Sequence, residues 1–201
     1  MLGFQDETWW SRVTPAQGSA WAEAQQPLRL VEQAVPKGEK KALSCYGLLA
    51  RCPADPAWSE QMWVRLVAER PVSVLTLEFL EWSCARLEAA GKRALLMVWD
   101  SSPVHACVQR HAGWHISREV RRWIRVHNWS VRRRGKGVRI VACYLPSRSP
   151  WLNPIEPKWM HGTRAVAEPD GLITLEELER RVCVHFDCEI EPHLCVAEKA
   201  A

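Results

Sequence analysis

The stretch Ser149-Pro150-Trp151-Leu152-Asn153-Pro154-Ile155-Glu156 predicts the start of a helix that carries a carboxylate in its first turn. Asparagine often caps a helix N-terminus, and proline suits the first helical position, where its missing backbone N–H leaves no hydrogen bond unmade. We therefore expect Asn153 to be the N-cap and Pro154 the first helical residue. The Glu156 carboxylate could alternatively serve only to complete the cap.

Two further acids stand where strands are predicted to end. The apolar run 94–99 is typical of a central strand covered on both faces, and Asp100 follows it directly. Residues 1–10 are expected to form a strand that ends near Asp6. Each acid alone could be an ordinary side chain at the end of an element. Together, carboxylates from two strand ends and a helix start can converge on divalent cations, which indicates phosphodiester chemistry on nucleic acid.

The rest of the chain alternates strands with helices. The further predicted strands are 42–49 and 138–145, and the further predicted helices are 73–90, 117–127 and the segment that opens with the capping box Thr174-Leu175-Glu176-Glu177. This alternation predicts one α/β domain with a mixed sheet over residues 1–201. Residues 188–201 are expected to form its C-terminal tail.

Basic residues concentrate in one part of the chain, although the net charge is only +4. The segment 118–139 contains a single acid, Glu119, so its cations suit a polyanion such as DNA, whose counterions they would release. On the predicted helix they could instead form only a solvated face, whereas 132–137 is predicted to be a turn. The candidate DNA-binding residues are Arg118, Arg121, Arg122, Arg125, Arg132, Arg133, Arg134, Lys136, Arg148 and Lys158.

Some classes of protein do not fit the sequence. No apolar run approaches the roughly 18 residues of a membrane-spanning helix, and no signal peptide is recognisable, so we expect a cytoplasmic protein. The 8 cysteines include no CxxC pair, and reduced thiols are expected. The cysteines and histidines between Cys183 and Cys195 lack the usual spacing of a zinc site.

Four short motifs resemble the DDE transposases, specifically the bacterial insertion-sequence branch of the mariner superfamily. They are Phe4-Gln5-Asp6-Glu7, Leu96-Met97-Val98-Trp99-Asp100, Trp114-His115-Ile116-Ser117 and the 149–156 stretch. The resemblance implies an RNase H-like fold in which Asp6, Asp100 and Glu156 hold two Mg²⁺ or Mn²⁺ ions. It also implies a bacterial, nucleoid-associated enzyme that cuts double-stranded DNA at transposon ends and joins the 3′-hydroxyl to target DNA, as a dimer on DNA.

The chain departs from this family beside the second aspartate. The family usually has Asn there and then a Trp-His pair, whereas here Ser101 follows and Trp114-His115 comes only after 103–113, which we interpret as an insertion. His105 has the family's spacing and His115 its local context, so either could lie near the metals or be a surface histidine. The candidate neighbours of the active site are Glu7, His105, His115 and Asn153.

Three functions stay open from the sequence. The first is a DDE transposase catalytic domain. The second is a catalytically inactive, truncated remnant that only binds DNA, which is favoured by the insertion and because the family's upstream helix-turn-helix region does not precede Asp6 here. The third is another RNase H-like nuclease, against which the motif Asn153-Pro154-Ile155-Glu156 argues.

Overall fold

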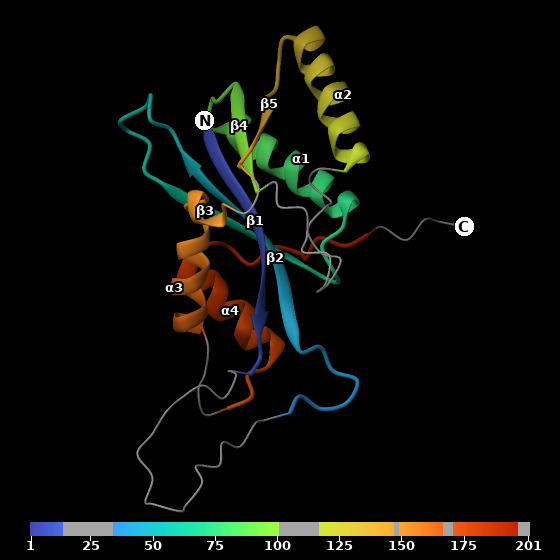
Figure 1. The fold of residues 1–201 in the computed structure, drawn as a ribbon, viewed down its shortest axis with the longest axis vertical. Coiled ribbons are helices and arrows are strands. Elements are labelled where there is room, and N and C mark those ends of the chain that lie inside the picture. The colour runs from blue at the N-terminus through green and yellow to red at the C-terminus, as the bar shows by residue number, and fades with distance from the viewer. Residues whose placement is uncertain (14–33, 101–116, 147–148, 167–170, 197–201) are drawn as a thin grey trace, which may run out of the picture.

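The computed structural model describes residues 1–13, 34–100, 117–146, 149–166 and 171–196. Their centre is a five-stranded sheet in the order β3-β2-β1-β4-β5 (Figure 1). The strands are β1 (Leu2–Ser11), β2 (Ala42–Arg51), β3 (Gln61–Val67), β4 (Ala94–Trp99) and β5 (Arg139–Tyr144). The helices are α1 (Ser73–Ala89), α2 (Arg118–Arg134), the short 3-10 helix η1 (Pro150–Leu152), α3 (Glu156–Val166) and α4 (Leu175–Phe186).

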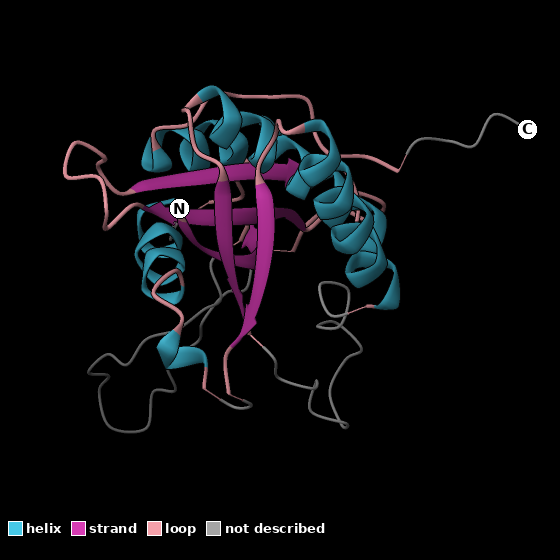
Figure 2. Ribbon diagram, turned by 90° about the horizontal axis from the view of Figure 1, so that it is seen from above, coloured by secondary structure: helices cyan, strands magenta, loops and turns pink. Residues whose placement is uncertain are grey.

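The sheet is mixed, as the sequence predicts. β1 pairs antiparallel with β2, and β2 pairs antiparallel with β3. On its other side β1 pairs in parallel with β4, and β4 pairs in parallel with β5. Helices lie on both faces of the sheet (Figure 2). The expected α/β fold with a mixed sheet and flanking helices is therefore confirmed.

Each face of the sheet has its own hydrophobic core. On one face, α1 and α2 cover Tyr46 and Leu48 of β2. On the other face, α3 and α4 cover Cys45 and Leu49 of the same strand. The division follows from strand geometry, because successive side chains point to opposite faces. Alternate residues of β1 and β2 therefore face different pairs of helices: one set faces α1 and α2, and the other faces α3 and α4.

The predicted strand over residues 1–10 is confirmed as β1, but β1 runs well past Asp6 and does not end near it. Its ladder with β2 continues as far as Ser11 opposite Ala42, and Trp10, only 2% exposed, anchors the continuation in the core. Pairing with β4 stops earlier, at Phe4 opposite Val98. Asp6 thus lies just beyond the point where β1 loses one neighbouring strand and keeps the other.

Two other elements differ from the prediction. α2 continues past His127 because Val131 extends its buried stripe, and it ends at Gly135, whose φ of 65° suits a glycine. Residues 132–134 of the predicted turn are therefore the last turn of a helix. The edge strand β3 has no counterpart among the predicted elements. None of the helices in the described ranges is long and apolar enough to cross a membrane.

Candidate active site

Asp6 and Asp100 come from neighbouring strands. The parallel ladder of β1 and β4 sets Phe4 opposite Val98. Asp6 lies two residues after Phe4 in β1, and Asp100 directly follows β4, so both acids lie just past the end of this ladder. Alternation along the strand places Asp6 on the face of Phe4, and the charge of Asp100 acts on Glu156.

Glu156 reaches this face from the first turn of α3. The helix is held on the sheet by the buried side chains of Ile155, which directly precedes it, and Trp159 within it. Phe4 packs against the same core, and Asp6, which has the same parity in β1, therefore faces α3. The structure thus brings Glu156 to the face of the sheet that carries Asp6.

The three acids also interact electrostatically. Burial raises the pKa of Asp6 well above its ordinary value of 3.8, and the negative charges of Glu7 and Glu156 raise it further. Burial likewise raises the pKa of Glu156, and the charge of Asp100 adds to the effect. Hydrogen bonds partly oppose the increase at Asp6, among them one that the Trp159 indole Nε1 donates to Asp6 Oδ2 at 3.1 Å. A cation would relieve the repulsion within this group.

The acids do not, as they stand, form a closed set of metal ligands. Within the described parts of the chain, no group of three or more His, Cys, Asp or Glu side chains is placed to hold a metal ion. This holds for the triad and for the described cysteines and histidines near the C-terminus alike. The donors are hard oxygens of the kind that Mg²⁺ and Mn²⁺ prefer.

Asn153 does not cap α3 with its side chain, contrary to the prediction. The helix begins only at Glu156, after a turn that contains Pro154, so its first N–H groups lie beyond the expected cap. The Asn153 backbone oxygen accepts from the Glu156 N–H at 3.1 Å. The side chain is fully buried, and its amide nitrogen and oxygen have no hydrogen-bond partner among the described residues. Leaving such an amide unpaired costs about 1–3 kcal/mol.

Glu7 lies on the opposite face of the sheet from Asp6, as strand alternation requires. Its Oε1 accepts a hydrogen bond from Nε2 of Gln5 at 3.1 Å. Gln5 is only 2% exposed, and its own oxygen accepts from the Trp99 indole. The Glu7 side chain therefore acts on Asp6 through its charge, whereas its backbone hydrogen bond to Asp6 lowers the pKa of Asp6. His105, His115, Arg148 and the predicted insertion 103–113 lie outside the described residues.

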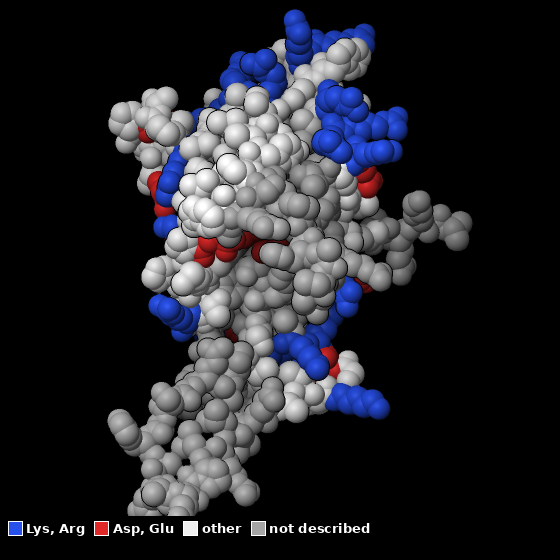
Figure 3. Space-filling view, viewed as in Figure 1, with Lys and Arg blue, Asp and Glu red and all other residues white. Residues whose placement is uncertain are grey.

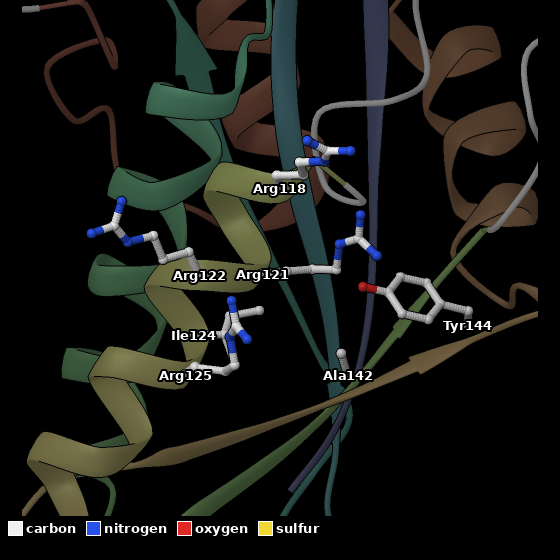
Figure 4. A pocket seen from close by; sticks show the side chains of 7 residues that line it. All are labelled: Arg118, Arg121, Arg122, Ile124, Arg125, Ala142 and Tyr144. Carbon is white, nitrogen blue, oxygen red and sulfur yellow. The ribbon is translucent and has the colours of Figure 1, made fainter.

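A groove between α2 and β5 carries part of the cationic surface, on the α1–α2 face of the sheet. Its volume is about 530 Å³, and it is lined by Arg118, Arg121, Arg122, Ile124, Arg125, Ala142 and Tyr144 (Figure 4). Arg121 and Tyr144 extend toward one another across it. Burial raises the pKa of Tyr144, and the charge of Arg121 partly opposes this. The Tyr144 ring stacks on Trp99, with 5.9 Å between centroids, so the groove adjoins the strand end that carries Asp100.

The other basic candidates have different surroundings. Lys and Arg side chains gather over α2 (Figure 3). Those of its last turn include Arg133, which lies 5.3 Å from the ring centroid of Trp129, and cations there favourably face the helix C-terminus. Lys158 pairs with Glu60 at 2.7 Å, on the side of α3 roughly 200° away from Glu156.

Two residues of this region are absent from the sequence-based candidates. Tyr144 ends the strand next to the one that delivers Asp100, and the ends of parallel strands meet at one edge of a sheet. That rule was available from the sequence. Trp159 lies one helical turn after Glu156, so helical spacing already places it on the same side of α3. Its hydrogen bond to Asp6 depends on the packing of α3 against β1, which no sequence pattern specifies.

Neither the known family models nor the curated proteins contain a match to this sequence. Solved structures do match, among them the Mos1 strand transfer complex, with a TM-score of 0.59 and 16% identity over 94% of this chain. The Mos1 transposase paired-end complex with the left transposon end gives 0.58 and 16%, and the Mos1 mariner paired-end complex with Mn gives 0.57 and 17%. The chain spans 48% of the length of each Mos1 chain. It therefore has the RNase H-like α/β fold found in part of these mariner transposase structures.

Proposed function

We propose that this chain is the catalytic domain of a DDE transposase. The proposal is supported by the origin of Asp6, Asp100 and Glu156 in β1, the end of β4 and the start of α3, and by the electrostatic effects of Glu156 on Asp6 and of Asp100 on Glu156. The structural neighbours that share this fold are transposase complexes, two of them described as paired-end complexes. The motif of residues 149–156 favours the bacterial insertion-sequence branch.

Asp6, Asp100 and Glu156 would hold two divalent cations, Mg²⁺ or Mn²⁺. A mutually repelling set of carboxylates supports this, as does the presence of Mn in one neighbouring complex. When bound, such a metal pair activates an attacking water or 3′-hydroxyl and stabilises the leaving oxygen. The chain's own contribution is to present its three acids from fixed elements, so that the scissile phosphate is approached from one face of the sheet.

The exposed arginines of α2 would hold the DNA backbone along the groove beside the end of β4. Arg118, Arg121, Arg122 and Arg125 follow one another at helical spacing along the groove that ends at Tyr144. Contacts of this kind fix the position of a duplex without reading its sequence. We accordingly propose double-stranded DNA, both transposon ends and target, as the substrate, bound by a dimer in the bacterial nucleoid.

A catalytically inactive, DNA-binding remnant is the second candidate. It is favoured by the insertion that the sequence predicts after Asp100. The two functions share the cationic helix and differ only at the three acids. They predict different behaviour with Mn²⁺, because only the enzyme requires the three acids to bind a cation.

Nicking of supercoiled plasmid in the presence of Mn²⁺ distinguishes the two. The transposase proposal expects nicking by the wild type and its loss in Asp100→Ala, with an unchanged circular dichroism spectrum. Glu69→Ala, which removes an exposed carboxylate on the segment after β3, is the matched control and should nick normally. Equal inactivity of wild type and Asp100→Ala, with DNA binding retained, would establish the remnant instead.

A further inference from the structure

Trp159 is packed against the strand pair that carries Asp6. Asp6 of β1 lies opposite Gly47 of β2 in the antiparallel ladder. The indole of Trp159 occupies the space over that glycine, where a Cβ atom would come within 2.3 Å of the ring. Glycine at this single ladder position therefore lets a large aromatic ring from α3 lie directly beside the first acid.

The orientation of the indole is fixed by its surroundings. Trp159 is only 4% exposed, and its ring packs edge-on against Trp10 and Phe186, with centroid distances of 5.8 and 5.5 Å. Trp10 is itself held by a hydrogen bond from its indole to the sulfur of Cys45. With the ring enclosed in this way, Nε1 is directed at Asp6 Oδ2, 3.1 Å away.

An indole N–H is well suited to hold a metal-binding carboxylate. The indole has a single N–H and no acceptor capacity, so it engages one oxygen of Asp6, whose carboxylate also accepts from the Glu7 backbone. It is also neutral, whereas a lysine or arginine in its place would repel an incoming cation. Partners of this kind, which orient a ligand without touching the metal, commonly set metal affinity.

We propose that Trp159 is the positioning residue of the first acid, and that its N–H fixes the Asp6 carboxylate in the orientation that binds a divalent cation. The role rests on the function proposed above. Because Trp159 lies one turn after Glu156 on α3, the same helix supplies the third acid and orients the first. A shift of α3 would therefore disturb two of the three acids together.

The test replaces only the N–H. β-(3-Benzothienyl)alanine is a tryptophan isostere in which sulfur takes the place of the N–H, and it is incorporated at position 159 alone. The same replacement at Trp129, which is 62% exposed on α2, is the matched control. Mn²⁺ affinity is measured by electron paramagnetic resonance, without DNA. We expect about 10- to 100-fold weaker binding for the position 159 variant and no change for the control.

A second readout examines the hydrogen bond without metal. The indole ¹H–¹⁵N resonance of Trp159, assigned by its loss in Trp159→Phe, should move upfield in Asp6→Ala. The positioning role is refuted if the chemical shift of the Trp159 indole is unchanged in Asp6→Ala. It is also refuted if Mn²⁺ affinity is equal with and without the N–H.

The same titration separates this inference from the proposed function. Wild type that binds Mn²⁺ more tightly than Asp100→Ala, together with an equally tight position 159 variant, refutes the role of Trp159 alone. Wild type that binds no better than Asp100→Ala refutes the metal site, and the positioning role with it.

Discussion

The Trp99 indole donates a hydrogen bond to the side-chain oxygen of Gln5, across the pair formed by β1 and β4. Both side chains are almost fully buried, and Nε2 of Gln5 donates a second hydrogen bond to Oε1 of Glu7. The contact ties the end of β4, and so the residue before Asp100, to the strand that carries Asp6.

Replacement of Trp99 by phenylalanine should therefore destabilise the protein. The ring is largely kept, but the oxygen of Gln5 is left buried without its donor, at a cost of about 1–3 kcal/mol. Urea denaturation monitored by circular dichroism gives the free energy of unfolding. A loss below about 0.5 kcal/mol, typical of surface changes, would show that the hydrogen bond is unimportant for the fold.

The raised pKa of Asp6 predicts that the metal-free protein is more stable when this side chain is neutral. A carboxyl group whose pKa is higher in the folded state contributes stability below its unfolded pKa, and this contribution is lost as pH rises through the folded pKa. Asp6→Asn should thus exceed wild type in melting temperature at pH 7.5, and the difference should shrink as pH falls toward the ordinary value of 3.8.

Addition of Mn²⁺ should reverse that order, because the cation stabilises only a protein that can bind it. The melting temperature of wild type should rise with Mn²⁺, and that of Asp6→Asn should not. An Asp6→Asn protein that is less stable than wild type throughout the pH range would contradict the assigned cause of the shift.

The arginines along the α2–β5 groove should determine the salt dependence of DNA binding. Each phosphate contact that is lost reduces the slope of log affinity against log salt by about 0.9. Arg121→Ala with Arg125→Ala should therefore lower the slope by roughly two units, for duplexes of any sequence. Arg180→Ala on α4, which removes an arginine already paired with Glu177, is the control. An equal reduction of the salt slope in the Arg180→Ala control would show that the groove is not the DNA-binding surface.

A methyl group at Gly47 should impair metal binding from a distance. The added Cβ would meet the Trp159 ring at 2.3 Å and displace it from Asp6. Gly3→Ala is matched, since its Cβ would meet Leu48 and Leu95 at 2.8 Å on the other side of the sheet. Both variants should lose about 1–3 kcal/mol of stability through overpacking. Only Gly47→Ala should bind Mn²⁺ more weakly, and equal affinities would argue against the link.

Glu191 should hold the C-terminal segment against the sheet. Its carboxylate contacts Arg65 at 3.0 Å and Arg86 at 3.5 Å, and it accepts from the Trp82 indole at 3.0 Å. Glu191→Ala should cost about 1.5–3 kcal/mol, as expected for hydrogen bonds that involve charged groups. Amide exchange at Leu194, which donates to Leu66 O, should accelerate. The exposed neighbour Glu189→Ala should change neither measurement.

Local signals in the sequence predict most of the frame. The apolar run before Asp100 and the cap at Thr174 correspond to β4 and α4, where the Thr174 hydroxyl accepts from the Glu177 N–H. The end of β1 could not be predicted in this way, because its length is set by pairing with a distant strand, β2. The cap at Asn153 fails for a related reason, since residue preference describes an isolated helix start, whereas here the docking of Ile155 and Trp159 decides where α3 begins.

The sequence motifs name the members of the candidate site but do not specify their surroundings. That Asp6, Asp100 and Glu156 come from adjacent elements follows from the motifs and the order of strands. The hydrogen bond from Trp159 requires a glycine on β2, a strand that the motifs do not include. The orientation of the site residues therefore depends on contacts between segments that are far apart in the chain, and not on local sequence preferences.

A single helix brings both Glu156 and the partner of Asp6, and this has a consequence for how the centre comes into being. Before α3 packs on the sheet, the strands carry Asp6 and Asp100 without Glu156 and without the Trp159 hydrogen bond to Asp6. Docking supplies both at once, so assembly of the centre is close to all-or-none. Under the transposase function proposed above, copies in which α3 has not docked would leave the surrounding DNA uncut.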